Sequence, residues 1–360
     1  MASTWPAEVG LLRELVATPS VSGTEAAVAR LVEERARGWG LVVRSGAHGV
    51  VVEVRGARPG PTLGFLSHLD TVPPGEGWTR DPFVPVIEGD RLYGRGAGDA
   101  KAAVAAMLCA ARDVAAQGLE AGRLLVLLGL GEETKHTTMG ALVAAESPVD
   151  AAIVGEPTNL QLAVAQRGLM MVDLVAHGHQ RHVGYAAADG EFVNAAVALA
   201  RDLVRLEDLF RDREHPVLGR TVATPTMVQA GVSRNVTPPT ATAVLDVRST
   251  PNWTHAEVAA ELRRALASEV VVTSERLVPC ETPPGSRLLA VMRRLRPASA
   301  PFGSPTCSDW VFVRDRDAVK CGPGTSRRSH TADECVDLPE VTEARRYYAA
   351  TALAYLHGED

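Results

Sequence analysis

Residues 124–140 read LLVLLGLGEETKHTTMG, an uninterrupted apolar run followed by two adjacent acids, Glu132 and Glu133. A short apolar run of this kind predicts a buried strand, which is typical of a sheet covered by helices on both faces. Two carboxylates placed directly after such a strand face either water or a positive charge. The segments around this one bear on which of the two interpretations holds.

The composition excludes several classes of protein. The chain has 360 residues, 46% of them hydrophobic and 22% charged, which describes an ordinary globular protein and favours two domains. A formal charge of -6 offers no basic field for nucleic acid or anionic lipid. No apolar stretch approaches the ~20 residues of a membrane span. The five cysteines form no C-x-x-C pair and the N-terminus lacks a signal-peptide pattern, so we expect a cytoplasmic protein.

Strand and helix patterns alternate through the first half of the chain. The apolar segments 49–56, 61–70 and 149–157 indicate strands, and the Ala-rich segment 99–118 indicates a helix. Beyond residue 166 the order becomes β-α-β-β-α-β, which suggests an inserted ferredoxin-like unit. We therefore expect an α/β protein with a discontinuous catalytic domain (1–165 and 278–360) and an inserted lid and dimerisation domain (166–277).

Histidines and acids cluster at the ends of the predicted strands or in the loops that follow them. Two imidazoles and three carboxylates outside the opening motif share this placement: His68, His330, Asp70, Asp99 and Glu156. Open α/β sheets bind ligands at the carboxyl ends of their strands. Such a set without thiols suits two divalent ions, zinc or else cobalt or manganese, that share one carboxylate. A further acid would take the proton of an attacking water, and Glu132 beside Glu133 suits that role.

Each of these residues also has a plain structural alternative. A single His68 or His330 is more often a partly buried structural histidine than a metal ligand. Asp99 precedes a predicted helix and would serve as an N-cap, while Glu156 before a proline would form a turn. The combination of all of them is far less frequent by chance than any one, so it favours a metal site.

Five motifs together resemble, in order and spacing, the metal motifs of the M20 zinc-peptidase family. They are SHLDTVP (67–73), LYGRGAGDAK (92–101), GEE (131–133), GEPT (155–158) and SHTADE (329–334). The resemblance covers nearly the whole chain and implies a zinc-peptidase-like mixed sheet and a di-metal hydrolase of amide bonds.

The resemblance also implies a role for each matching residue. His68 and Glu156 would hold one ion and Glu133 and His330 the other, with Asp99 bridging the two. Asp70 would orient the His68 imidazole, Glu132 would be the general base, and the Asp99–Ala100 peptide bond would be cis.

The predicted lid carries a second group of candidate residues. GHQRHVGYA (178–186) resembles a family motif whose histidine reaches into the partner's active site in a homodimer, which makes His182 the candidate. Asn235 and Arg248 match positions that hold the carbonyl and the carboxylate of the substrate in relatives. A turn residue and a surface strand residue are the plain alternatives for these two positions.

The resemblance favours a deacylase that acts on a small N-acyl amino acid, most like acetylornithine or acetylcitrulline deacetylase. Succinyl-diaminopimelate desuccinylase and a short-peptide carboxypeptidase or dipeptidase are alternatives, and an inactive ligand-binding relative is a remote one. The lid motif favours the desuccinylase branch, whereas HTADE favours the acetyl-amino-acid deacetylases. Ala102 and Cys307 depart from the usual family residues, and Arg327 and Arg328 are either solvated charges or recognise an acidic group.

Overall fold

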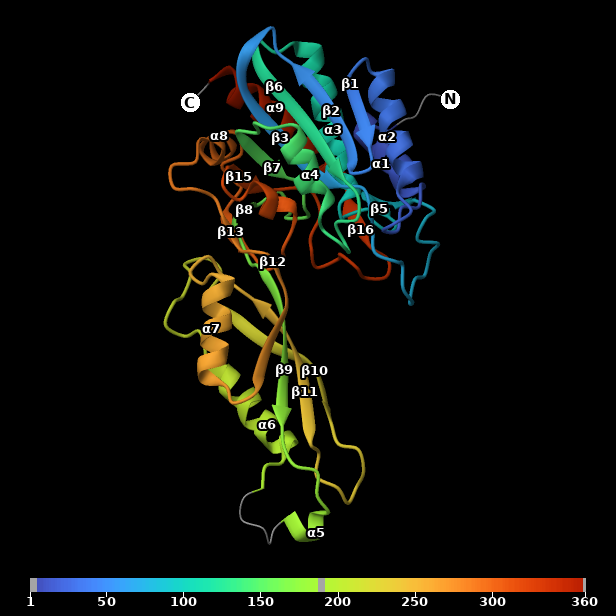
Figure 1. Cartoon of the computed structure of the whole chain (residues 1–360). Helices are drawn as coiled ribbons and strands as arrows, with labels where there is room; N and C mark the ends of the chain where they lie inside the picture. The colour runs from blue at the N-terminus through green and yellow to red at the C-terminus, as the bar shows by residue number, and fades with distance from the viewer. Residues whose placement is uncertain (1–4, 187–191, 359–360) are drawn as a thin grey trace. The chain divides into compact units, whose positions relative to one another are not determined.

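The computed structural model describes residues 5–186 and 192–358 (Figure 1). Two compact units divide the chain. The larger unit consists of Met1–Val164, Thr282–Phe302 and Ser308–Asp360, and the smaller one of Ala165–Glu281 with Gly303–Cys307. The smaller unit thus contains the predicted insertion 166–277 together with a short segment from further along the chain, while the role of lid and dimerisation domain stays a prediction.

A mixed sheet forms the centre of the larger unit. Its strands run in the order β1-β2-β6-β3-β7-β15-β8, and β14 also pairs with β8. The two residues of β13 pair with Ala165 and Gln166 at the end of β8, and all four belong to the smaller unit. The four strands β6, β3, β7 and β15 are parallel to one another, and β1, β2 and β8 run antiparallel to their neighbours. The bounds are β1 (Val42–Gly46), β2 (Gly49–Arg55), β3 (Arg58–His68), β6 (Ala121–Gly129), β7 (Ala151–Val154), β8 (Leu162–Gln166), β13 (Cys280–Glu281), β14 (Pro301–Ser304) and β15 (Asp317–Lys320).

Helices cover this sheet, and the larger unit also has a small three-stranded sheet with the strand order β16-β5-β4. In Figure 1, α4 lies in front of the central strands, and α3 and α9 lie behind them. The bounds are α1 (Ala7–Val16), α2 (Ala26–Gly38), β4 (Val86–Glu88), β5 (Arg91–Tyr93), α3 (Lys101–Gln117), α4 (Thr138–Ala145), α8 (Arg287–Leu295), the 3₁₀ turn η2 (Asp309–Val313), β16 (Cys335–Asp337) and α9 (Leu338–His357).

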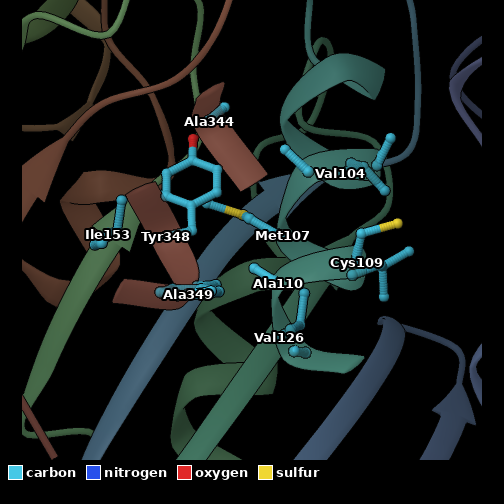
Figure 2. Close-up of a cluster of buried hydrophobic side chains, with 14 of the residues drawn as sticks. Val104, Met107, Cys109, Ala110, Val126, Ile153, Ala344, Tyr348 and Ala349 are labelled. Atoms are coloured by element: carbon cyan, nitrogen blue, oxygen red, sulfur yellow. The ribbon is translucent and has the colours of Figure 1, made fainter. Parts of the chain in front are cut away.

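The core of the larger unit lies between the sheet and the helix pair α3 and α9. The alanines of α3 let this helix come close to its neighbours, and every residue from its first to Ala111 is buried. Figure 2 shows Met107 pointing from α3 toward the Tyr348 ring on α9. The ring centroid of Tyr348 lies 5.4 Å from that of Phe65 on β3, and its hydroxyl donates to the Cys321 carbonyl at 2.7 Å. This packing fixes the strands whose ends carry the polar residues.

The smaller unit has its own antiparallel sheet, in the strand order β10-β11-β9-β12, with α6 and α7 on one face (Figure 1). Inward residues of β9 and β11 alternate with outward ones, as a half-exposed sheet requires. The elements are β9 (Leu169–His177), α5 (Val183–Ala186), α6 (Ala195–Arg205), η1 (Leu206–Asp208), β10 (Val222–Ala230), β11 (Thr240–Arg248), α7 (His255–Ala265) and β12 (Glu269–Leu277). The predicted fold class, a mixed α/β sheet with a βαββαβ unit, is confirmed. Within the described residues, no helix has both the length and the apolar character that crossing a membrane requires.

An ion-pair cluster joins the first and last helices of the larger unit. The fully buried Glu8 carboxylate accepts hydrogen bonds from Arg345 Nη1 and Thr342 Oγ1, both at 2.7 Å, and Arg345 also binds Asp113. Burial opposes ionisation of Glu8, but these hydrogen bonds outweigh it and hold its pKa below the ordinary 4.5. The charged form of Glu8 therefore stabilises the fold above pH 4.5, and this contribution is lost as the pH falls through the lowered pKa.

Glu8→Gln is accordingly expected to lower the free energy of unfolding by about 2–3 kcal/mol near neutral pH, the usual worth of a hydrogen bond to a charged group. Urea denaturation of both proteins across a pH series measures the difference. The difference should shrink as the pH falls below 4.5, because wild type then loses the same charge. A difference that stays constant across the series would contradict this account.

Candidate active site

The polar residues after the strands meet because three parallel strands end at the same level. His68 is the last residue of β3 and pairs in register with Gly129, the last residue of β6. Leu66 of β3 pairs with Val154, the last residue of β7. The side chains that follow β6 and β7 therefore lie beside His68 at the carboxyl edge of the sheet.

A first donor group forms around the buried His68. Its Nε2 lies 3.3 Å from Asp99 Oδ1 and 3.9 Å from Glu156 Oε1. One ligand atom from each of the three residues lies within 4.8 Å of the others, which is close enough to hold one ion. Nδ1 of the same ring lies 3.0 Å from the Asp70 carbonyl oxygen, so Nε2 is the nitrogen that faces the donor group.

A second donor group shares Asp99 with the first. Nε2 of His330 lies 3.0 Å from Glu133 Oε1 and 3.7 Å from Asp99 Oδ2. Asp99 therefore turns one carboxylate oxygen to each group, the arrangement expected of a bridging ligand. The Asp99–Ala100 peptide bond is cis, as the family resemblance predicted.

The electrostatics of these groups suit bound cations. Burial, followed by the negative charge of Asp99, raises the pKa of Glu156 well above its ordinary value. The same two causes act on Glu133 and raise its pKa, although the hydrogen bond with His330 opposes them. Divalent cations between these acids would remove the repulsion, and oxygen and imidazole donors without thiols match zinc, cobalt or manganese. The residues present thus fit a two-ion centre.

Asp70 connects the two strand ends in a way that the sequence did not reveal. Its Oδ1 lies 3.4 Å from His68 Nδ1, in keeping with the predicted orienting role. Its carboxylate also accepts from the backbone N–H groups of Glu132 at 3.0 Å and Glu133 at 3.1 Å, and from Ser22 Oγ at 2.6 Å. Burial opposes its ionisation, but these partners lower the pKa of Asp70 below its ordinary range. One carboxylate therefore sets both the ring of His68 and the turn that carries the paired glutamates.

Glu334 holds the loop of Asp99 and was not singled out from the sequence. Its buried carboxylate accepts from the backbone N–H groups of Gly96, Gly98 and Asp99 at 3.0, 2.9 and 3.0 Å. It also accepts from Arg95 Nη1 at 2.6 Å, and Arg95 is itself buried. Its place at the end of SHTADE was the one available signal.

Glu132 is the acid that belongs to neither bridged group. Its carboxylate comes within 4.8 Å of the donor atoms of His68 and Glu133, so it borders both. Its Oε1 lies 3.1 Å from Nδ1 of the buried His136. This position beside the donor groups is the one that the general-base prediction requires.

His182, Asn235 and Arg248 belong to the smaller unit. His182 is exposed and forms an isolated antiparallel β-bridge with Val236. The backbone N–H of Val183 donates to the Asn235 carbonyl at 3.0 Å, so the segments of His182 and Asn235 lie side by side. Arg248 ends β11 and makes a two-bond contact with Asp246 at 2.7 and 3.0 Å. The roles assigned to these three residues stay predictions.

Comparisons with known proteins bear on this arrangement. The model of peptidase family M20/M25/M40 matches residues 64–354. The chain belongs to this family. Succinyl-diaminopimelate desuccinylase of Phenylobacterium zucineum is 31% identical over 96% of this chain and 98% of the relative.

Two solved structures share the fold of this family member. Aminopeptidase PepT from Bacillus cereus superimposes with a TM-score of 0.80 at 19% identity, covering 96% of this chain and 97% of that one. A dinuclear metal-binding M20 peptidase of Bacillus subtilis gives 0.74 at 17% identity, covering 97% and 98%. Family membership confirms the predicted enzyme class, an M20 metallohydrolase.

Proposed function

We propose that this M20 hydrolase cleaves the amide bond of an N-succinyl amino acid of the diaminopimelate type. The observation that carries the hydrolytic part is Asp99, whose two carboxylate oxygens face two separate donor groups. The relative named succinyl-diaminopimelate desuccinylase, matched over nearly its whole length, supports the succinyl substrate. This alternative is therefore preferred to acetylornithine or acetylcitrulline deacetylase, the leading expectation from the sequence.

The proposed chemistry assigns each group a task. Two divalent ions, held by His68 and Glu156 on one side and Glu133 and His330 on the other, would polarise the acyl carbonyl and acidify a water. Glu132 takes the proton of the attacking water and delivers it to the leaving amine. Asp70 fixes His68 and the Glu132–Glu133 turn together, so donor and base keep their relative positions during the reaction.

Residues of the smaller unit would complete the site. A second copy of the chain would supply His182 to the developing oxyanion, and Asn235 would hold the substrate carbonyl. A guanidinium binds a carboxylate through two parallel hydrogen bonds, so Arg248 suits an acidic end of the substrate. Its contact with Asp246 fixes the direction of the guanidinium.

Metal analysis and a substrate panel test this proposal. The purified protein is loaded with zinc, cobalt or manganese, and the panel contains succinyl-diaminopimelate, acetylornithine, acetylcitrulline and an unmodified dipeptide. We expect the largest kcat/KM with the succinyl compound. A preference for an acetyl compound would overturn the substrate assignment, and no hydrolysis of any amide by the metal-loaded protein would overturn the hydrolase assignment.

The proposed role of His182 across a dimer can be tested by mixing two inactive variants. His182→Ala and Glu132→Gln chains are each expected to be nearly inactive alone. Mixed dimers are expected to regain activity, because one of their two sites then has both native residues. Subunit exchange is verified with differently tagged chains, and a mixture of two His182→Ala preparations serves as the control. Verified exchange without recovered activity would show that His182 does not act across a dimer.

A further inference from the structure

A row of three titratable side chains begins at Glu132 and continues through the buried His136 and Asp309. Nδ1 of His136 lies 3.1 Å from Glu132 Oε1 and 3.1 Å from the Glu132 carbonyl oxygen. Nε2 of the same ring lies 3.4 Å from Asp309 Oδ1. The exposed fractions of the His136 and Asp309 side chains are 6% and 3%. An imidazole thus stands between two carboxylates, one of them the proposed general base.

The surroundings of His136 hold its ring in this place. Its backbone has a φ of 50°, in the left-handed region, and its N–H donates to the Gly131 carbonyl at 2.9 Å. Its ring stacks on Phe312 of η2, with centroids 5.7 Å apart. Asp309 belongs to the same turn η2, so this turn contacts the His136 ring through both Phe312 and Asp309. A residue kept in an infrequent backbone conformation by several contacts is a candidate for a functional role.

The charge of the ring agrees with this arrangement. Burial disfavours the imidazolium, but the hydrogen bond and charge of Glu132, with the charge of Asp309, outweigh it and raise the pKa of His136 to about 9. Below that pH the ring is protonated, and Nδ1–H faces the Glu132 carboxylate at 3.1 Å.

We propose that His136, backed by Asp309, is a positioning residue that holds the Glu132 carboxylate in the direction needed for proton transfer. The proposal rests on the proposed function, because it presumes that Glu132 is the base. A base must lie within hydrogen-bond reach of the proton it takes, and a carboxylate on a flexible side chain loses rate when its direction is free. His136 contacts neither bridged donor group, so its role is separate from holding the ions.

A matched pair of variants tests this role in the metal-loaded enzyme. His136→Gly and His136→Asn both accept a left-handed backbone. Asn keeps an amide N–H near the position of Nδ1, whereas Gly keeps none. We expect His136→Gly to lower kcat by about 10–100-fold, as loss of an orienting partner does around metal ligands. KM and the number of bound ions should stay unchanged, and His136→Asn should recover most of the rate.

The same substitutions in a Glu132→Gln background separate positioning from general damage. In that background His136→Gly should cause no further loss of kcat, because there is no base left to position. If His136→Gly does not fold, Asp309→Asn replaces it, with an expected loss of about threefold to tenfold that likewise vanishes beside Glu132→Gln.

Several results would overturn the proposal. Wild-type kcat in His136→Gly would do so, as would an equal loss of kcat with and without Glu132. Loss of a bound ion from His136→Gly would assign the cluster to metal binding instead. Failure of the hydrolase assignment is distinguishable, because wild type would then hydrolyse no substrate of the panel, whereas a failed substrate assignment would change only which compound is preferred.

Discussion

Glu132→Gln is expected to lower kcat by about 10²–10⁴-fold while the metal content stays that of wild type. The amide has the shape of the carboxylate but cannot accept the proton of the attacking water. Glu132 borders the donor groups without belonging to the pair bridged by Asp99, so its replacement leaves the bridged ligands in place. Asp70 holds the turn through the backbone N–H of residue 132, which the substitution does not alter.

The neighbouring acid provides a matched control for this experiment. Glu133→Gln makes the same chemical change one residue further along, but Glu133 lies 3.0 Å from His330 within the second donor group. We therefore expect Glu133→Gln to lower metal content and activity together. Metal content is measured by elemental analysis of the purified proteins and kcat on the same samples. A Glu132→Gln protein that keeps the wild-type rate with its metal bound would show that another group is the base.

His68, Glu133 and Glu156 could be predicted as candidate donors because each ends or follows a strand that the apolar pattern reveals. His68 follows 61–67 and Glu133 follows the run at 124–130, and both strands are parallel neighbours in the sheet. Parallel strands end at a common edge, so the sequence order of the motifs translates into proximity. The direction of Asp99, one oxygen to each donor group, needed the structure, which also showed the cis bond after it.

The supporting residues could not be predicted in the same way. Glu334 binds backbone N–H groups 235 to 238 positions earlier, and a backbone donor leaves no mark on the sequence. His136 and Asp309 belong to segments that local pattern describes as a loop and a turn. Their meeting depends on how α4 and η2 pack, which no periodicity in either segment specifies. The partners that support the site are set by tertiary packing, whereas His68, Glu133 and Glu156 are placed by the strands that they end or follow.

Asp99→Asn is expected to abolish measurable turnover and to remove both ions at once. An amide offers one oxygen where the carboxylate offers two, and it carries no charge, so neither donor group keeps a bridging anion. The fold of the loop should survive, because Glu334 accepts from the backbone N–H of residue 99 and not from its side chain. Elemental analysis should show metal content well below one ion per chain, with thermal unfolding still cooperative.

Glu156→Gln is the matched control for the bridge. Glu156 lies 3.9 Å from His68 and belongs to the first donor group alone. Its replacement should weaken the site of that group and leave one ion at the Glu133–His330 pair, which keeps all its donors. The two variants thus differ in the number of ions lost, although each removes one carboxylate. If Asp99→Asn also retained one ion, Asp99 would serve a single donor group, and the shared-ligand geometry on which the proposed hydrolase rests would be wrong.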